Sequence, residues 1–414
     1  MTEFYDALET RDPEAREQAL LAALPPQIAA AQGTPALGAI LAGVDAGAVT
    51  SRAALAALPV TRKSELLLRQ QAARPFGGFS AIGWRALGLR PARRVFQSPG
   101  PIYEPEGAAP DYWRFGRALF AAGLRAGDLV HNSFSYHLTP AGAMMEGGAH
   151  RLGCTVFAGG VGNTELQLQA MDELKPEAYA GTPSFLRIAV EKAAETGRPL
   201  SITKASVGGE AFPPALRDWL AARGIQAYQS FGTADCGLIA YETAAREGLV
   251  LDEGVIVEIV RPGTGERLPD GEVGEIVVTV LNPDYPLVRF GTGDLSAVLP
   301  GRCPTGRTQA RIKGWMGRAD QTAKVRGMFV HPSQVAEVRR RHPELGRARL
   351  VVEGEMANDR MTLKAEAAAA PEGLAAAVAA TLRDVTKLRG EIELCAPGSL
   401  PNDGKVIDDL RKIG

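Results

Sequence analysis

Hydrophobic and polar positions follow one another along the chain in patterns that predict alternating strands and helices. The segment Arg11–Leu24 is rich in alanine and leucine at helical spacing, and the pair Pro25-Pro26 is expected to end this helix. Further along, the apolar run Leu152–Ala158 is typical of a buried strand, and the segments around it repeat the order strand then helix. Strands that alternate with helices in this way favour a parallel α/β sheet.

The later part of the chain has a different pattern. Val250–Val260 and Gly271–Val280 are rich in β-branched residues and predict a hairpin. A helix opening at His331, a strand at Arg347–Val352 and a helix at Glu372–Asp384 then predict a small α+β domain. We therefore predict an α/β fold with a large N-terminal domain of parallel α/β sheets, a small β-rich subdomain within it, and a small α+β C-terminal domain.

Size, composition and charge limit the classes of protein to which the chain could belong. A chain of 414 residues is long enough for two or three domains, and its net charge of −1 gives no electrostatic footprint for nucleic acid or an anionic membrane. There is no run of about 18 apolar residues and no apolar segment of signal-peptide type near the acidic N-terminus. The four cysteines form no C-x-x-C pair, so reduced thiols are expected. We expect a cytoplasmic protein without nucleic-acid or membrane partners.

Charged residues gather after the predicted strand Gly274–Leu281. Arg289, Asp294, Arg311 and Arg318 all fall at loop or strand-end positions. Asp294 follows Gly-Thr-Gly, so its backbone is free to bend, and its carboxylate could accept both hydroxyl protons of a ribose. Arg311 could reach the same sugar or a phosphate with its planar fork of donors.

This stretch resembles a known family. The segments RFGTGDLS and RIKGWMGRADQTAKVRGMFVHPSQV resemble those of the adenylate-forming enzymes, most closely the phenylacetate–CoA ligase family. The resemblance implies that Asp294 holds the ribose of ATP, that Arg311 also binds the nucleotide, and that Asp320 is a hinge. It also implies an adenylate-forming domain at residues 1–318 and a mobile C-terminal domain at residues 319–414.

A second group of residues carries the same resemblance. Ser206-Val-Gly-Gly-Glu ends a predicted strand with two glycines, where a flat ring could approach the backbone closely. The segment Phe231-Gly-Thr-Ala-Asp resembles the family's aromatic-Gly-x-[Ser/Thr]-Glu, with the threonine one place early and aspartate in place of glutamate. The resemblance implies that Phe231 stacks on adenine and that Asp235 acts in catalysis by holding Mg²⁺. The implied nucleotide-binding residues are Gly208, Gly209, Glu210, Phe231, Gly232 and Thr233.

The expected phosphate loop departs from the family pattern. The family has a run of Ser, Thr and Gly that ends in Gly-Lys-Pro, whereas this chain has Phe96–Gly107 with Ser98 as a remaining hydroxyl. Pro99 lacks a backbone donor, and Glu104 and Glu106 are expected to add negative charge where a triphosphate binds. Altered or lost ATP handling therefore stays open.

Three further segments match the family. Leu58-Pro-Val-Thr-Arg-Lys-Ser-Glu-Leu resembles a segment before the nucleotide site, for which we expect a packing role. Tyr136 and His137 align with the border of the acyl pocket. Near the C-terminus, Leu400-Pro-Asn-Asp-Gly-Lys405 resembles the family's Leu-Pro-x-x-x-Gly-Lys, although this chain has one residue fewer between proline and glycine. The family's catalytic lysine maps to Lys405, which a tight turn at Asp403-Gly404 would present.

The resemblance implies an acyl-CoA ligase that uses ATP, Mg²⁺ and CoA. A carboxylic acid, for which the resemblance implies the aryl or arylacetic class, would be converted to an acyl-adenylate and then to a CoA thioester. Two alternatives stay open. Because the phosphate loop is altered, the protein could bind a nucleotide or acyl-adenylate without making the adenylate. Because the sequence does not define the thiol that receives the acyl group, the enzyme could load a carrier protein and not CoA. The oligomeric state is open, with a homodimer as one candidate.

Overall fold

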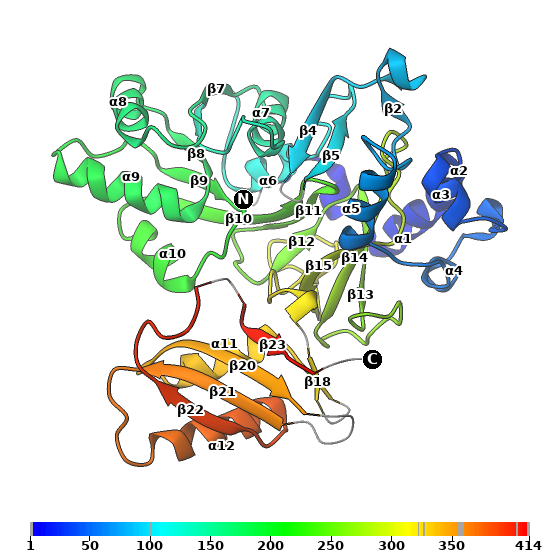
Figure 1. Cartoon of the computed structure of the whole chain (residues 1–414). Coiled ribbons are helices and arrows are strands. Elements are labelled where there is room, and N and C mark those ends of the chain that lie inside the picture. The colour runs from blue at the N-terminus through cyan, green and yellow to red at the C-terminus, as the bar shows by residue number, and fades with distance from the viewer. Residues whose placement is uncertain are drawn as a thin grey trace. The chain divides into compact units, whose positions relative to one another are not determined.

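The computed structural model describes residues 3–98, 101–321, 323–325, 328–354, 360–402 and 405–411, and at residues 64, 320, 324, 328 and 329 it describes the backbone alone. The chain forms two compact units (Figure 1). Unit 1 comprises Met1–Thr292 with Ala297–Trp315, and unit 2 comprises Gly293–Ser296 with Met316–Gly414. The domain boundary expected after residue 318 and the mobility of the C-terminal domain stay predictions.

A nine-stranded sheet forms the centre of unit 1, in the order β16-β17-β12-β11-β10-β9-β8-β6-β7. The strands from β10 to β7 run parallel to their neighbours, whereas the pairs from β10 to β16 are antiparallel. Parallel neighbours need a crossover, and helices supply it here, which confirms the predicted α/β class. The strands are β6 (Leu129–Asn132), β7 (Thr155–Ala158), β8 (Ala178–Gly181), β9 (Lys204–Val207), β10 (Gln226–Thr233), β11 (Gly237–Glu242), β12 (Leu249–Leu251), β16 (Val298–Leu299) and β17 (Arg311–Ile312).

Helices cover both faces of the parallel half. Ala178 and Ala180 of β8 belong to the hydrophobic core that includes residues of α6 and α7, whereas Tyr179 belongs to the core beneath α8, α9 and α10. Successive side chains of a strand point to opposite faces, so a strand between two helical layers must be apolar throughout. The helices are α6 (Gly116–Ala121), α7 (Ala141–Arg151), α8 (Thr164–Leu174), α9 (Pro183–Glu195) and α10 (Pro214–Ala221).

A second, four-stranded sheet has the order β1-β15-β14-β13. The antiparallel pairing of β13 with β14 confirms the hairpin predicted for this region. Every residue of these two strands is buried, which explains their nearly continuous apolar and β-branched sequence. The strands of this sheet and of two short ribbons are β1 (Thr61–Arg62), β13 (Val255–Val260), β14 (Gly274–Val280), β15 (Phe290–Ser296), β2 (Ile82–Gly83), β3 (Arg90–Pro91), β4 (Arg94–Ser98) and β5 (Ile102–Glu106).

The first helices show what Pro25-Pro26 does. The helix α1 (Pro13–Ala22) begins with Asp12, whose carboxylate accepts from two backbone N–H groups of the first turn. The next helix, α2 (Leu24–Gln32), starts immediately afterwards with both prolines in its first turn, where their missing N–H groups cost no hydrogen bond. The first helix therefore ends just before Pro25-Pro26, as expected, and the prolines lie in the first turn of a second helix. The helices that follow are α3 (Pro35–Ile40), α4 (Arg52–Ala56) and α5 (Lys63–Ala72).

A buried ionic network ties the segment before α1 to the rest of unit 1. The carboxylate of Glu9, which is 1% exposed, accepts from the Tyr241 hydroxyl at 2.8 Å and pairs with Arg307 at 3.0 Å. Asp6 makes a two-pronged ion pair with Arg117, with donor–acceptor distances of 2.7 and 3.0 Å. Glu9, Arg117 and Arg307 are buried, whereas Asp6 is partly exposed. The buried charges balance one another, so each depends on its partner.

Unit 2 is built on a four-stranded sheet in the order β22-β21-β20-β23. Helices α11 and α12 pack on it, because their apolar residues share one hydrophobic core with those of β20 and β21. This arrangement confirms the predicted α+β character. Its elements are the hairpin β18 (Ala323–Val325) and β19 (Met328–Val330), α11 (Pro332–Arg341), β20 (Leu345–Glu353), β21 (Arg360–Ala367), α12 (Leu374–Thr386), β22 (Glu391–Cys395) and β23 (Ile407–Asp409).

No helix in the described part of the chain is long and apolar enough to cross a membrane. The helices α9 and α12 have 13 residues each, whereas a helical membrane span needs about 20. The cytoplasmic location, the lack of nucleic-acid and membrane partners, and the oligomeric state stay predictions.

Candidate active site

An apolar cavity of about 170 Å³ lies at the carboxyl ends of the parallel strands of unit 1. Phe134 follows β6, Gly208 follows β9 and Thr233 ends β10. Ligands of open parallel sheets bind at this edge, so the cavity is the candidate active site. We call it the apolar pocket, and its lining residues are Ser98, Phe115, Phe134, Thr139, Pro140, Ala141, Met144, Met145, Gly208, Gly209, Ser230, Gly232, Thr233 and Ala234.

Five residues singled out from the sequence meet in this lining: Ser98, Gly208, Gly209, Gly232 and Thr233. Two of the glycines are required by the backbone. Gly209 has φ = +79°, and a Cβ on Gly232 would lie 2.6 Å from the carbonyl oxygen of Gly237. The structure thus brings the two predicted glycine segments to one cavity, although their centres are more than twenty residues apart in sequence.

An ion pair lies directly behind the pocket wall. Lys63, at the start of α5, places its Nζ 2.6 Å from Oδ2 of Asp235, whose side chain is fully buried. Burial alone would lower the pKa of Lys63, but the Asp235 carboxylate raises it above its usual value. The sequence analysis assigned the segment around Lys63 to packing and missed this cation. The match of that segment to the family was the signal that could have identified it.

The Asp235 carboxylate fits the predicted Mg²⁺ role. Its Oδ1 is buried and has no hydrogen-bond partner. Among the residues that the structure describes, no group of three or more His, Cys, Asp or Glu could hold a metal by itself. Mg²⁺ in nucleotide sites is commonly held by one or two carboxylates together with substrate phosphates and water, so one free carboxylate oxygen is a suitable donor. The metal-binding role of Asp235 stays a prediction.

The β4–β5 hairpin occupies the place expected for the phosphate loop, with residues 99 and 100 outside the described part. Ser98 donates both its hydroxyl and its backbone N–H to the Glu104 carboxyl group. Burial and the nearby Asp235 raise the pKa of Glu104 to about 8, so this group is protonated at neutral pH. Glu106 accepts two hydrogen bonds from Arg94. The expectation of added negative charge is therefore wrong for Glu104, whereas the charge of Glu106 is paired with Arg94.

Replacing Glu104 with glutamine tests this protonation. In the unfolded chain the carboxyl group ionises near pH 4.5, whereas the folded protein keeps the proton to about pH 8. Unfolding releases a proton between these pH values, so the free energy of unfolding of the wild type falls as pH rises through the window. Glutamine cannot ionise. We expect Glu104→Gln to raise Tm relative to wild type by more near pH 8 than near pH 4.5. Thermal unfolding across this range measures the difference, and a pH-independent difference would contradict it.

Asp294 pairs with Arg318 in unit 2. The Arg318 guanidinium donates to Oδ1 of Asp294 at 3.2 Å, and the two residues also form a β-bridge. Gly293 allows this approach, because a Cβ there would lie 2.7 Å from Nη2 of Arg318. The sequence analysis noted the position of Arg318 but gave it no role, although its place in Gly-Arg-x-Asp was the available signal. The Asp320 side chain lies outside the described part, and its hinge role stays a prediction.

Arg311 does not reach the apolar pocket in this structure. It lies on β17, which β12 and β11 separate from β10, so three strand spacings of roughly 14 Å in total lie between Arg311 and the pocket edge of β10. Its guanidinium is buried and donates to the carbonyl oxygens of Glu247 at 2.9 Å and Pro300 at 3.1 Å. These contacts hold the sheet together locally, and the nucleotide-binding role stays a prediction.

Four other predicted site residues lie outside the pocket lining. The ring of Phe231 packs against the core of the β-rich part of unit 1. Glu210 accepts from a backbone N–H in the first turn of α9 at 2.7 Å. The Tyr136 hydroxyl accepts from Asn132 at 2.8 Å, and His137 is exposed. Their roles in binding adenine, nucleotide or acid stay predictions.

Lys405 is an accessible cation of unit 2. Its side chain is 58% exposed, with Nζ 3.2 Å from Oδ1 of Asp408. The next residue, Val406, donates its N–H to the Gln321 side chain at 2.7 Å, which fixes the backbone beside the lysine. The predicted turn at Asp403-Gly404 lies outside the described residues. An exposed lysine is accessible to an anionic ligand. The catalytic role of Lys405 stays a prediction.

The sheet with its apolar pocket at the carboxyl edge agrees with the class of protein that sequence comparison finds. Residues 114–280 match the family model of the AMP-binding enzymes. The chain is 32% identical to the phenylacetate–coenzyme A ligase of Aromatoleum evansii, over 78% of this chain and 74% of that protein. It is 31% identical to the enzyme of the same name from Thermus thermophilus, over 78% and 75%. The chain belongs to the phenylacetate–CoA ligase family of adenylate-forming enzymes.

A solved structure extends the likeness over nearly the whole chain. The open conformation of 2-hydroxyisobutyryl-CoA ligase, in complex with 2-HIB-AMP and CoA, matches with a TM-score of 0.83 and 25% identity, covering 97% of this chain and 93% of that one. The protein is an acid–CoA ligase that works with ATP through an acyl-adenylate, as predicted. This assignment disfavours the alternative of a protein that only binds nucleotides.

Proposed function

We propose that the protein activates an aryl or arylacetic acid with Mg²⁺ and ATP and transfers the acyl group to CoA in the cytoplasm. The observation that carries the choice of acid is the apolar pocket. Its walls include Phe115, Phe134, Met144 and Met145 and no charged side chain. A volume of about 170 Å³ suits a single aromatic ring, since an apolar cavity of roughly 150 Å³ in another protein binds benzene. An uncharged ring in this pocket leaves its carboxylate at the polar rim.

The first half-reaction is assigned to groups of unit 1 and, by the family resemblance, to groups of unit 2. A carboxylate oxygen of the acid attacks the α-phosphorus of ATP, the bond to the β-phosphate oxygen breaks, and pyrophosphate leaves. We assign Lys63 to a phosphate oxygen, which its ammonium group would bind. Ser98 lines the pocket, but its hydroxyl donates to Glu104, so it binds a phosphate oxygen only when that hydrogen bond is exchanged. Mg²⁺ held by Asp235 would offset phosphate charge when bound. We assign the ribose to Asp294 and the stabilisation of the charge that moves to the phosphates to Lys405.

The second half-reaction needs a different set of groups. The CoA thiol, as thiolate, attacks the acyl carbonyl, the carbon–oxygen bond to the phosphate breaks, and AMP leaves with the bonding electrons. In this step charge moves onto the AMP phosphate. We assign Lys405 no part in it, because the family resemblance implies that the C-terminal domain has by then rotated about Asp320. This division of labour is part of the proposal and rests on the family resemblance.

A panel of acids tests the proposal. Pyrophosphate release is measured with phenylacetate, benzoate, 2-hydroxyisobutyrate and a straight-chain acid of similar size, each with and without CoA. We expect release to depend on the acid and to be fastest with an aryl or arylacetic acid, because only a ring fills the apolar walls. Fast release with 2-hydroxyisobutyrate and none with either aryl acid would overturn the choice of acid while keeping the ligase chemistry.

The pocket wall also predicts a change in selectivity. Met145→Ala removes a side chain that lines the apolar pocket, so kcat/KM should shift by about tenfold from phenylacetate towards a bicyclic arylacetic acid. Met171→Ala is the matched control, because Met171 is buried in the core under α8 and does not line the pocket. Both variants should lose about 2–5 kcal/mol of stability. Equal selectivity changes in both would argue against Met145 as part of the acyl site.

A further inference from the structure

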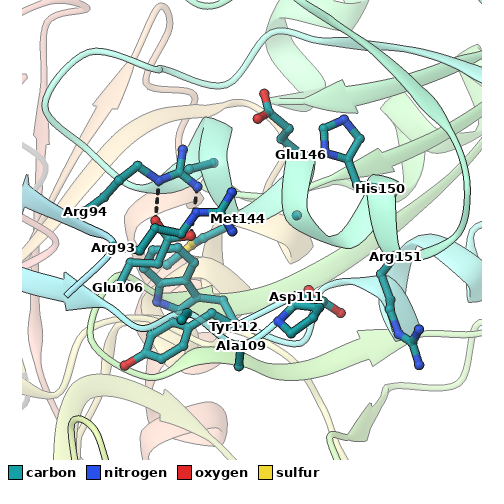
Figure 2. A pocket seen from close by; sticks show the side chains of 15 residues that line it. Arg93, Arg94, Glu106, Ala109, Asp111, Tyr112, Met144, Glu146, His150 and Arg151 are labelled. Atoms are coloured by element: carbon teal, nitrogen blue, oxygen red, sulfur yellow. Dashed lines mark hydrogen bonds and ion pairs between the residues drawn. The ribbon is translucent and has the colours of Figure 1, made fainter. Parts of the chain in front are cut away.

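A second cavity of unit 1, about 380 Å³ in volume, has walls of the opposite character. It lies between the start of the β4–β5 hairpin, the loop of residues 108–113, and one side of α7. Its volume is within the usual range for small-molecule sites. The ligase chemistry described above uses none of its charged side chains. Figure 2 shows Arg93, Arg94 and Glu106 on one side of the cavity, Glu146, His150 and Arg151 on the other, and Asp111 and Tyr112 below.

We call this second cavity the charged cavity. Most of its hydrogen-bonding groups that have no partner in the described part of the chain are donors. The Arg94 guanidinium is fixed by two hydrogen bonds to Glu106 (Figure 2). The side chains of Arg93 and Arg151 make no hydrogen bond or ion pair with any described residue. Each guanidinium carries five N–H donors in a planar fork that matches a carboxylate or a phosphate. Two such forks at one cavity favour an anionic ligand.

The same cavity holds one unused acceptor. Asp111 accepts the backbone N–H of Gly116 at 2.8 Å with Oδ2, whereas its Oδ1 is buried and has no partner. Its backbone is in the left-handed region with φ = 48°, a conformation that other residue types adopt at a cost. Burial raises the pKa of Asp111 to about 6, so the carboxylate is mostly ionised at neutral pH. A buried carboxylate oxygen without a donor is costly, and a hydroxyl or amine of a ligand would satisfy it.

Glu146 of α7 is a further carboxylate at this cavity, and burial together with the nearby Glu146 raises the pKa of the Tyr136 hydroxyl. Asp111 differs from Glu146, because its Oδ1 is buried and has no partner among the described residues. We propose that the charged cavity is a second ligand site, which binds a small oxyanion, a carboxylate or a phosphate, that also carries a hydroxyl or amine donor. Arg93 and Arg151 bind the oxyanion, and Oδ1 of Asp111 accepts from the donor.

The charged cavity and the apolar pocket share one wall residue, Met144. Side chains in a packed interior are not free to move independently, so an occupant of the charged cavity changes the position of Met144 or restricts it. Binding at one cavity is therefore expected to alter affinity at the other, in both directions by the same factor. The binding proposal itself does not depend on which acid the apolar pocket accepts.

Calorimetry with defined probes tests the site. Citrate and glycerol 3-phosphate represent the carboxylate and phosphate sources, and tricarballylate is the analogue of citrate without the hydroxyl. The full chain is titrated in saturating AMP, so that the nucleotide site does not take up the probes. We expect one site with a Kd of about 1 mM or lower for at least one of the first two probes. The probe with the lower Kd shows whether the site prefers a carboxylate or a phosphate. If citrate binds, tricarballylate should bind about tenfold more weakly, because Asp111 then lacks its donor.

Two double variants with the same loss of charge separate a built site from general attraction. Arg93→Ala with Arg151→Ala should weaken binding by at least about tenfold. Arg187→Ala with Arg198→Ala removes two exposed arginines outside the cavity and should leave Kd unchanged. Thermal unfolding checks that all variants fold. The proposal is overturned by no binding of citrate or glycerol 3-phosphate at about 10 mM, or by equal weakening in both double variants.

Discussion

Lys405→Ala is expected to slow acyl-adenylate formation by ~10²–10³, or roughly 3–4 kcal/mol, and to leave thioester formation from a supplied acyl-adenylate near the wild-type rate. The reason is that a positioned cation acts where charge develops, and Lys405 is assigned to the step in which charge moves onto the departing pyrophosphate. Acid-dependent pyrophosphate release measures the first step. The appearance of the CoA thioester from a supplied acyl-adenylate measures the second.

Lys387→Ala is the matched control for this prediction. Lys387 is another exposed lysine of unit 2, 68% exposed and paired with Asp384, so its loss removes the same charge from the same unit. Both half-reactions should be unchanged in this variant. If Lys405→Ala slows both half-reactions equally, Lys405 acts on something other than the leaving of pyrophosphate, and the assignment fails.

The second large effect is expected for Lys63→Ala. Removal of the ammonium group leaves the fully buried carboxylate of Asp235 without its ion-pair partner. Breaking a buried pair costs about 3–5 kcal/mol, and the 27% exposure of Lys63 places the expected loss of stability near 3 kcal/mol. Affinity for MgATP should also fall, by at least about tenfold, because a phosphate oxygen loses a charge-assisted donor. Urea unfolding and calorimetry with MgATP measure the two effects separately.

A double variant distinguishes the two roles of Lys63. In Lys63→Ala with Asp235→Asn the buried carboxylate is gone, so much of the lost stability should return. MgATP binding should stay weak, because neither the cation nor the carboxylate for Mg²⁺ is present. Recovery of MgATP affinity along with stability would show that Lys63 supports the fold of the site and does not bind phosphate.

The fold was largely predictable because its signals are local. The alternation of apolar strands with helices sets the parallel half of the main sheet, and the β-branched runs set the β13–β14 hairpin. The glycines at 209 and 232 were also readable, since each occupies a place that a side chain would strain or fill. The end of the first helix near Pro25-Pro26 was predicted, but the second helix was not, because a proline pair that follows one helix is equally compatible with the first turn of the next.

The electrostatics of the site were not predictable from the sequence. Lys63 and Asp235 are 172 positions apart in sequence, so no local sequence pattern predicts their contact. The charge of Glu104 depends on burial and on a neighbouring carboxylate, both of which are products of the tertiary fold. Arg311 and Arg318 look equivalent as letters in a loop. In the structure they differ. The Arg311 guanidinium donates to two backbone carbonyl oxygens, whereas the Arg318 guanidinium donates to Asp294.

The ionic anchor at Asp6 and Glu9 limits how unit 1 can be shortened for laboratory work. A version of the protein that starts after residue 12 would remove the carboxylates that pair with Arg117 and Arg307, together with the Tyr5 and Phe4 rings that lie over these guanidinium groups. It would also expose the apolar surface that the segment covers, so a loss of stability is expected. Crystallographers and engineers who wish to trim the ligase should therefore preserve this leading peptide and place affinity tags ahead of it.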